Sequence, residues 1–178
     1  MPTIEYSLSR KTKLYRIVWY ISWRILAMWL PRTAASGWKR ILLRIFGAKV
    51  SKEAIVYSSA KIYDPRQLIM KGKSVIGPGA EIYNVDYVTL EDGAIVSQNA
   101  YLCTASHNID IPSRPLIMAP ILLKKNSWVA ARAIVGMGVT IGENAVVGMG
   151  GVICSNVPDN LIVAGNPAKP LRNRNIAR

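Results

Sequence analysis

Aliphatic residues return at every sixth position through the C-terminal half of the chain. The series runs through Leu123, Val129, Val135, Ile141, Val147 and Ile153. A helix repeats its apolar face at intervals of three and four residues and a strand at two, so this period belongs to neither element alone. Four positions after each aliphatic residue stands a mostly small one, such as Ala133 or Ala145. The pattern predicts a repeating unit of one short strand and a turn, with the aliphatic residue pointing inward.

The same period organises the preceding residues into sets of three. These sets are Val50, Val56 and Ile62, then Met70, Ile76 and Ile82, then Leu90, Val96 and Leu102. The steps from one set to the next are longer, eight residues twice and then 21 residues to Leu123. Because every surplus follows a third member, we expect triangular coils whose extra residues all leave at one corner. The sequence therefore predicts an all-β fold, a parallel β-helix of about five coils over residues 48–158, with a loop at 103–120.

The first 47 residues lack this pattern and predict a helical extension. Residues 14–30 are nearly all apolar, follow three basic residues and end before Pro31. At about 100° per residue, Lys13, Arg16 and Arg24 share a narrow stripe, which makes this helix amphipathic. These 17 residues with two arginines are too short and too charged for a membrane span. Two interpretations stay open: the helix lies in the membrane surface, or it packs on its own domain or on a neighbouring subunit.

A second short helix is predicted between Ser36, which caps it, and Gly47, which ends it. Its apolar residues indicate a face that covers the end of the next domain; they are Trp38, Ile41, Leu42, Ile45 and Phe46. After the last coil, residues 159–178 are expected to form a C-terminal cap and a basic tail. The chain is thus expected to be one domain with an N-terminal appendage.

The charge is strongly positive and uneven. The 178 residues include 23 Lys and Arg against 10 Asp and Glu, a net charge of +13, and Glu5 is the one acidic residue among the first 46. An anionic partner is expected, namely lipid headgroups, nucleic acid or a phosphorylated cofactor. Nucleic acid is not favoured, because the basic residues form no recognisable binding motif with aromatic residues. The register places Cys103 and Cys154 about 10 Å apart, so we expect free thiols and a cytoplasmic protein.

Four stretches resemble one known superfamily. They are "GWKRILLRIFGAKV", "YLCTASHN", "SWVAARAIVGMGVTIGENAVVG" and "VAGNPAKPL", and the resemblance covers about residues 37–174. Their order resembles that of the hexapeptide-repeat acyltransferases, in particular the colanic acid and exopolysaccharide biosynthesis acetyltransferases. The resemblance implies a left-handed β-helix, acetyl-CoA as co-substrate, no metal, direct transfer without an acyl-enzyme, and a homotrimer with its active sites between subunits. A γ-class carbonic anhydrase shares the fold but needs three histidines for zinc, and this chain has one.

The single histidine, His107, stands where the long loop leaves the coil. Loops on rigid scaffolds commonly carry function, and an imidazole can take a proton from an attacking hydroxyl and pass it to a leaving thiolate. We therefore expect His107 to be the catalytic base. By resemblance, Asn84 and the neighbours Ser106 and Asn108 would contact the acceptor. For Asn84 a purely structural role in a turn is an open alternative.

The resemblance also implies a donor site. The backbone N–H of Ala131 would face the thioester oxygen, and Trp128 would pack on the pantetheine arm, with packing at a subunit interface as its alternative. Ala130 replaces the family's usual glycine, which puts close backbone approach there in doubt. Lys169 and Arg172 would pair with the phosphates, and a solvated basic tail is their alternative.

These residues together predict an acetyl-CoA-dependent O-acetyltransferase. Its expected acceptor is a sugar hydroxyl of a surface polysaccharide or of a lipid-linked oligosaccharide precursor, at the inner face of the cytoplasmic membrane, with peripheral membrane contact through residues 14–30. An amino-sugar N-acetyltransferase is one open alternative, because the scaffold and the base would look alike. A catalytically inactive, membrane-associated trimeric scaffold is the other.

Overall fold

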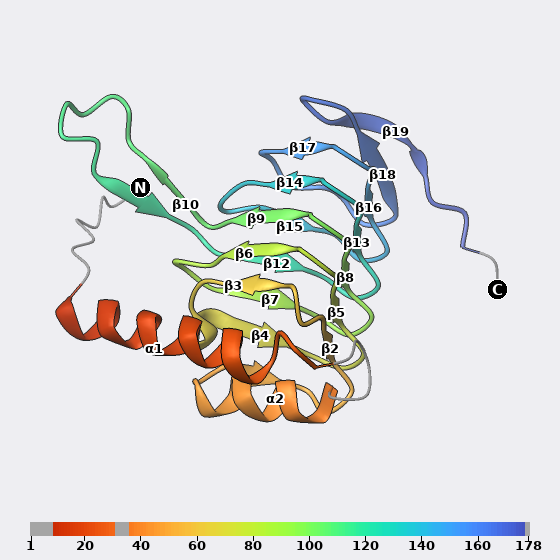
Figure 1. Cartoon of the computed structure of the whole chain (residues 1–178). Coiled ribbons are helices and arrows are strands. Elements are labelled where there is room, and N and C mark those ends of the chain that lie inside the picture. The colour runs from red at the N-terminus through yellow and green to blue at the C-terminus, as the bar shows by residue number, and fades with distance from the viewer. Residues whose placement is uncertain (1–8, 31–35, 177–178) are drawn as a thin grey trace.

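Two helices precede a stack of short strands in the computed structural model, which describes residues 9–30 and 36–176. Helix α1 spans Arg10–Leu26 and α2 spans Ser36–Ile45. Figure 1 shows the stack rising from α2 at one end to β18 and β19 at the other. Each coil of the stack contributes one strand to each of three walls, which together enclose the core.

The walls are parallel sheets that run the length of the stack. The first wall contains β1 (Lys49–Val50), β4 (Leu68–Met70), β7 (Val88–Leu90), β12 (Ile121–Leu123) and β15 (Thr140–Ile141). The second contains β2 (Ile55–Val56), β5 (Val75–Ile76), β8 (Ile95–Val96), β13 (Trp128–Val129), β16 (Val146–Val147), β18 (Leu161–Ala164) and β19 (Lys169–Asn173). The third contains β3 (Lys61–Ile62), β6 (Glu81–Tyr83), β9 (Tyr101–Cys103), β14 (Ile134–Val135) and β17 (Val152–Ile153). Within the three walls as the structure describes them, every neighbouring pair is parallel except β18 and β19.

The inward aliphatic residues stack in the predicted register. Val50 pairs with Met70, and Leu123 pairs with both Leu90 and Ile141. All 15 residues predicted to point inward are at most 6% exposed, so the triangular coil is confirmed. Five full coils are followed by a partial sixth layer, in which β18 pairs with β16. Stacking is what buries this core, because a single coil cannot cover its own inward residues.

The extra residues leave the stack at one corner, as predicted. We call the corner between the third and first walls the hairpin corner; it comprises residues 63–67, 84–87 and 104–120. The first of its two short segments, 63–67, contains the 3₁₀ helix Pro65–Gln67, and the second, 84–87, is a tight turn. Its long surplus forms the antiparallel hairpin of β10 (Ala105–His107) and β11 (Leu116–Met118). Figure 1 shows this hairpin projecting away from the walls.

Buried polar side chains join successive layers at the hairpin corner. Asp64, Asn84 and Thr104 are each at most 2% exposed. The amide of Asn84 accepts from the N–H of Asp64 at 3.0 Å and donates to its carbonyl at 2.6 Å. Thr104 donates to the carbonyl of Tyr83 and accepts from the N–H of Asp86. These bonds satisfy backbone groups that the widened turns would otherwise leave unpaired in the interior.

The corner between the second and third walls has no insertion. We call it the alanine corner; it comprises residues 57–60, 77–80, 97–100, 130–133 and 148–151. Its turns are tight, with positive φ at Gly79, Asn99, Arg132 and Gly150. Alanine or glycine follows each of these positions and is buried at the bend, where a larger side chain would not fit.

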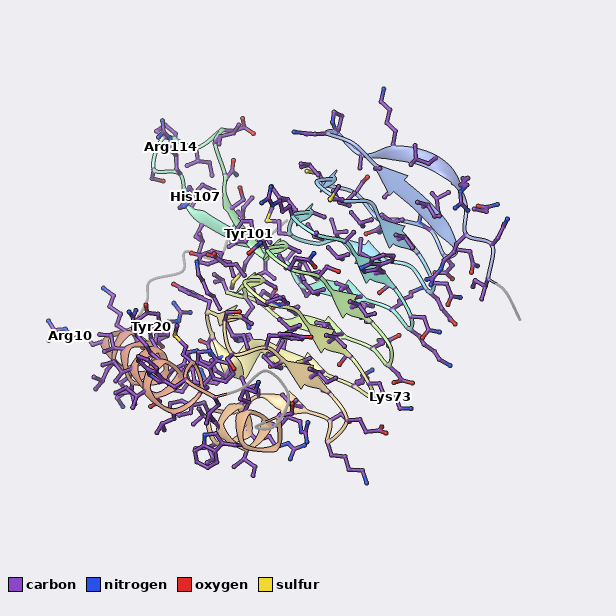
Figure 2. All side chains as sticks on the ribbon, turned by 45° about the vertical axis from the view of Figure 1, so that its right-hand side comes forward. Arg10, Tyr20, Lys73, Tyr101, His107 and Arg114 are labelled. Carbon is purple, nitrogen blue, oxygen red and sulfur yellow. The ribbon has the colours of Figure 1, made fainter. Side chains whose placement is uncertain are left out.

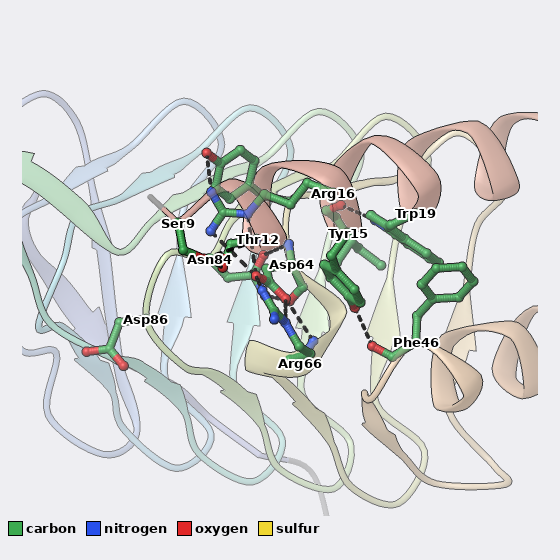
Figure 3. A network of polar contacts seen from close by, with 12 residues as sticks. Ser9, Thr12, Tyr15, Arg16, Trp19, Phe46, Asp64, Arg66, Asn84 and Asp86 are labelled. Carbon is green, nitrogen blue, oxygen red and sulfur yellow. Dashed lines mark hydrogen bonds and ion pairs between the residues drawn. The ribbon is translucent and has the colours of Figure 1, made fainter. Parts of the chain in front are cut away.

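Helix α1 packs one face on the first coil. Trp19 and Trp23 are 2% and 6% exposed and donate to the carbonyls of Ile62 and Ser58. Arg16 pairs with the buried Asp64 and donates to the hydroxyl of Tyr63 at 2.7 Å (Figure 3). Packing on its own domain is therefore the correct interpretation for this face of the helix. No helix in the described part of the chain is both long and apolar enough to cross a membrane.

Helix α2 covers the end of the prism with a different face from the one predicted. Lys39, Leu42 and Leu43 are buried, whereas Trp38 and Ile45 are 41% and 69% exposed. The prediction was right for Leu42 and for Phe46, which packs against the core, and wrong for Trp38, Ile41 and Ile45. Lys39 can be buried on this face because its Nζ donates to the hydroxyl of Ser58 at 3.3 Å.

Candidate active site

The hairpin presents His107 outside the prism. Strands β10 and β11 pair Ser106 with Ile117 and His107 with Leu116. Both Ser106 and His107 are exposed. Figure 2 shows His107 on the hairpin with Arg114 near its tip, well away from the stacked coils. The imidazole is thus available to a substrate that approaches from outside the chain.

A backbone carbonyl fixes the tautomer of His107. Its Nδ1 lies 2.6 Å from the carbonyl oxygen of Arg114. A carbonyl oxygen only accepts, so Nδ1 carries the proton and Nε2 of the neutral ring keeps its lone pair. Arg114 adopts a φ of 45°, and its N–H donates to the carbonyl of Ile111. The turn at the tip therefore aims one carbonyl at the ring and leaves Nε2 as the basic atom.

Asn108 stabilises the same tip. Its side-chain oxygen accepts from the N–H of Asp110 at 3.1 Å, and its N–H donates to the carbonyl of Pro115. Ser106 lines a cavity of about 330 Å³ at the foot of the hairpin, next to Gly136 and Met137. Both residues stand beside His107, as the sequence predicted, and their contact with an acceptor stays a prediction. Cys103 and Cys154, which also line this cavity, are not bonded to each other.

Asn84 lies lower on the hairpin corner and is fully buried. Both polar ends of its amide bond the backbone of Asp64, as Figure 3 shows. This arrangement favours the structural alternative, in which Asn84 joins two turns. Its proposed contact with an acceptor hydroxyl is not tested by these contacts.

The predicted donor residues gather on the second wall and at the alanine corner. Trp128 is 42% exposed and donates from its indole to the hydroxyl of Ser97 at 2.8 Å. Ala130 is buried, and its N–H donates to the carbonyl of Val147 at 2.9 Å, so its methyl group does not interrupt the ladder. Ala131 accepts from Gly150, while no partner for its own N–H is found among the described residues. A backbone donor at an open corner is suited to an oxyanion.

Lys169 and Arg172 are exposed on β19, the last strand of the same wall. Beside them, Cys154, Leu161, Asn166 and Pro170 help to line a cavity of about 300 Å³ at the end of the stack. Two cations next to a partly apolar hollow are suited to an anionic nucleotide. The structure thus puts all five predicted donor residues on one side of the molecule.

A single chain does not unite the donor residues with His107. The hairpin leaves one edge of the third wall, and Ala131 stands at its opposite edge. Figure 1 shows the hairpin on one side of the stack and β13, β16 and β18 on the other. One copy of the chain therefore keeps two predicted half-sites apart, one with Ala131 and the other predicted donor residues, and one with His107.

Neighbouring phenols do not compete with the imidazole as bases. Burial raises the pKa of Tyr83 and of Tyr101, which lie on the third wall, and nearby Tyr63 and Cys103 respectively raise these pKa values further. Both hydroxyls therefore stay protonated at neutral pH. Among the described residues, no cluster of three or more His, Cys, Asp or Glu side chains could hold a metal ion.

The fold points to the class of protein. The triangular parallel β-helix is the fold of the hexapeptide-repeat acyltransferases. Solved structures of this class superimpose on the chain. An acetyltransferase of Vibrio cholerae, VCA0836, solved with acetyl-CoA, gives a TM-score of 0.81 at 21% identity and covers 94% of this chain and 91% of its own. A galactoside acetyltransferase solved with coenzyme A gives 0.82 at 18% identity, covering 98% and 92%. The β-helix is left-handed, as in these proteins.

Sequence comparison identifies the family within this class. WcaF of Escherichia coli strain K12, whose name assigns it to colanic acid biosynthesis as an acetyltransferase, is 31% identical over 157 residues. The match covers 88% of this chain and 86% of WcaF. No protein-family model matches the chain. The chain belongs to the family of hexapeptide-repeat acetyltransferases that includes WcaF, and the resemblance described from its motifs is confirmed.

Sequence reasoning missed two features of the site. The role of Arg114 is carried by its carbonyl, which no side-chain pattern reveals. The second is the set of buried polar side chains at the hairpin corner, Asp64, Asn84 and Thr104, which we call the polar column. It was detectable in principle, because these residues are spaced by 20 residues, the length of one coil with its extra corner residues. That spacing places the three side chains in successive layers.

Proposed function

We propose that the protein is an acetyl-CoA-dependent O-acetyltransferase acting on a sugar hydroxyl of a surface polysaccharide or of its lipid-linked oligosaccharide precursor. The observation that carries the proposal is the hydrogen bond from His107 to Arg114, because it leaves Nε2 free to accept a proton. The name of WcaF supports a polysaccharide as the destination of the acetyl group. The galactoside acetyltransferase with the same fold supports a sugar as the acceptor.

His107 acts as base and then as acid. Its Nε2 removes the proton of the sugar hydroxyl while the hydroxyl oxygen bonds to the thioester carbonyl carbon. The Ala131 N–H stabilises the negative charge that develops on the carbonyl oxygen. When the carbon–sulfur bond breaks, the imidazolium returns the proton to the leaving thiolate. The products are an acetyl ester and free coenzyme A, and the enzyme regains its starting protonation state.

The active protein is a homotrimer in this proposal. The hairpin of one protomer reaches the alanine corner of the next, so that His107 and Ala131 of different copies face one reacting group. The separation of the two half-sites within one chain supports this arrangement. Closed symmetry then gives equivalent sites from identical contacts.

The donor lies along the second wall in this proposal. Trp128, with Ala130 and Ala131 beside it, flanks the pantetheine arm, and Lys169 and Arg172 pair with the phosphates. The acceptor approaches from the hairpin side, where Ser106 and Asn108 flank the base. We place the reaction in the cytoplasm, at the inner face of the membrane, where acetyl-CoA and lipid-linked precursors are both accessible.

The test measures release of coenzyme A with a thiol reagent, using the full-length protein, acetyl-CoA and galactosides or lipid-linked oligosaccharides. We expect His107→Ala to lower turnover by about 10²–10⁴-fold. Lys73→Ala, a substitution of an exposed side chain on a distant turn, is the control and should retain activity. A product that mild alkali deacetylates is an ester, whereas one that survives identifies an amino-sugar N-acetyltransferase. Absence of turnover on every acceptor would favour the inactive scaffold.

A further inference from the structure

Helix α1 has a second face that its packing does not explain. The inner face is occupied by Trp19 and Trp23. The opposite face exposes large apolar side chains to solvent, each between 47% and 63% exposed: Leu14, Ile17, Val18, Ile21 and Ile25. Their spacing of three and four residues forms a continuous ridge along the helix. Soluble monomers rarely expose a contiguous apolar surface of this kind unless it binds something.

Helix α2 continues this apolar surface. The indole of Trp38 donates to the carbonyl of Leu26, at the end of α1, with a distance of 2.9 Å. Trp38, Ile41 and Ile45 are 41%, 48% and 69% exposed and share the side of α2 that faces away from the prism. The exposed residues of α2 therefore begin where those of α1 end. We call the two sets together the helical face.

The described residues of the two helices carry positive charge and no negative charge. Residues 9–30 and 36–46 contain no Asp or Glu. Arg10, Lys11, Lys13 and Arg24 are exposed on α1, and Arg44 is exposed on α2. Figure 2 shows Arg10 at the outer end of α1, extending away from the solenoid. Arg24 donates to the hydroxyl of Tyr20 beside the ridge, which keeps this cation close to the apolar side chains.

This charge pattern decides between the two plausible occupants. A second copy of the chain that met the helical face with its own helical face would bring like charges together without an acidic partner. An anionic phospholipid surface supplies the opposite charge for the basic residues and an acyl region for the aliphatic ridge. The exposed Trp29 and Tyr20 are residue types that favour the headgroup level.

We propose that the helical face is a docking surface for an anionic phospholipid bilayer. The aliphatic ridge of α1 inserts at the boundary of headgroups and acyl chains, α2 extends the contact, and Trp19 and Trp23 hold α1 on the prism. The two interpretations of the N-terminal helix thus apply to opposite faces of one element. The idea that docking brings the enzyme to a lipid-linked acceptor rests on the proposed function. The docking of the helical face on a bilayer does not depend on that function.

The experiment measures flotation of the full-length protein with vesicles of phosphatidylcholine, with or without 30% phosphatidylglycerol, an amount chosen as roughly that of an anionic leaflet. We expect binding to the anionic vesicles only, and weaker binding at high salt because the basic residues contribute. The variant Ile17→Gln/Ile21→Gln/Ile25→Gln should lower the bound fraction by about tenfold or more. Ile176→Gln, at another exposed isoleucine, is the matched control and should bind as the native chain does.

Folding and function are checked separately. The substituted side chains are 50% exposed or more, so thermal unfolding should change little. Turnover on a soluble sugar should be unchanged in the triple variant. Equal binding of the triple variant and the native chain, or no binding to anionic vesicles, would overturn the proposal. A third outcome would also overturn it: the triple substitution dissociates an oligomer of the native chain, while neither the native chain nor the variant binds vesicles. The helical face would then be an interface between copies of the chain. Vesicle binding without acetyl transfer would instead contradict the proposed function alone.

Discussion

The hairpin corner and the alanine corner bound the same wall yet are built in opposite ways. The hairpin corner accepts every insertion, buries polar side chains between its layers and ends in a hairpin with an exposed imidazole. The alanine corner turns tightly at every layer and leaves the N–H of Ala131 open among the described residues. One corner thus offers a side chain that can move a proton, and the other a rigid backbone donor.

This difference shows how a repetitive fold acquires a site. Repetition keeps the turns of the alanine corner nearly equal in length, because each turn must bring its strand into register with the layer below. Insertions at a single corner leave the registers intact, so chemistry can be added there at little cost to the stack. The expected consequence is a site shared between copies, with one corner from each.

The sharpest test of this comparison mixes two inactive variants. His107→Ala removes the base, and Lys169→Glu/Arg172→Glu removes the proposed phosphate contacts on exposed positions. Each should lose most activity alone, about 10²-fold or more for His107→Ala. Coexpressed, they should recover about a quarter of the native sites if the two corners meet across a subunit boundary. Recovery is measured as turnover per purified mixed oligomer.

The mixed oligomers need a matched control. The two variants are also purified separately and combined without exchange of subunits, and this mixture should stay inactive. If the coexpressed protein is also inactive although both variants assemble, the two corners do not cooperate across copies.

A smaller effect is expected at the tip of the hairpin. Arg114 holds a φ of 45°, and its carbonyl fixes the ring of His107. Arg114→Val disfavours this conformation by roughly 1–2 kcal/mol, so we expect kcat to fall about tenfold with KM nearly unchanged. Arg114→Gly adopts the same conformation readily and should retain activity. Equal loss in both variants would indicate that the Arg114 side chain, and not its carbonyl, is needed.

Stability should also distinguish the corners. Asn84→Ala leaves buried backbone groups of Asp64 without partners and should cost about 1–3 kcal/mol in the free energy of unfolding. Ala131→Gly at the alanine corner removes one methyl group and should cost about 0.5–1 kcal/mol. Chemical denaturation of both variants measures the difference. A loss at Ala131 equal to that at Asn84 would contradict the structural role given to the polar column.

The smallest expected effect concerns pH. At the base of the alanine corner, Lys39 donates to Ser58, and burial lowers the pKa of Lys39 below its usual 10.5. The unfolded chain therefore binds this proton more tightly, so this group makes folding more favourable as pH rises from the lowered pKa toward 10.5. Lys39→Met should remove that part of the slope in the free energy of unfolding. The native chain and the variant should show identical slopes if Lys39 titrates normally.

The buried charge at the hairpin corner is held in ion pairs. Asp64 is buried between Arg16 and Arg66, and Arg66 contacts it through two nitrogen atoms at 2.9 and 2.6 Å (Figure 3). Burial raises the pKa of the adjacent Tyr15 to about 12, and its hydroxyl donates to the carbonyl of Phe46. This cluster joins α1 to the corner from which the hairpin rises two layers further along the stack.

The sequence by itself determined the prism, its inward residues and the corner that carries the hairpin. Each of these follows from the six-residue period. A residue such as Val135 or Leu102 is buried because every sixth position points inward, and this holds whichever residue lies in the next layer. The position of His107 at the start of the long insertion was readable for the same reason. The sequence motifs around His107 and in the coils also identified the family.

Only the tertiary structure decided which face of each helix is packed, that a carbonyl fixes the tautomer of His107, and that His107 and Ala131 lie at opposite edges of one wall within a single chain. On α1 both faces are rich in apolar residues, so hydropathy alone cannot rank them; the indole bonds of Trp19 and Trp23 to the first coil select the inner one. On α2 the packed face includes Lys39, whose Nζ donates to Ser58, and hydropathy alone would have placed a lysine outside. The helix faces depend on contacts between segments distant in sequence, and the tautomer depends on the backbone conformation at the hairpin tip; no hydrophobic period encodes either.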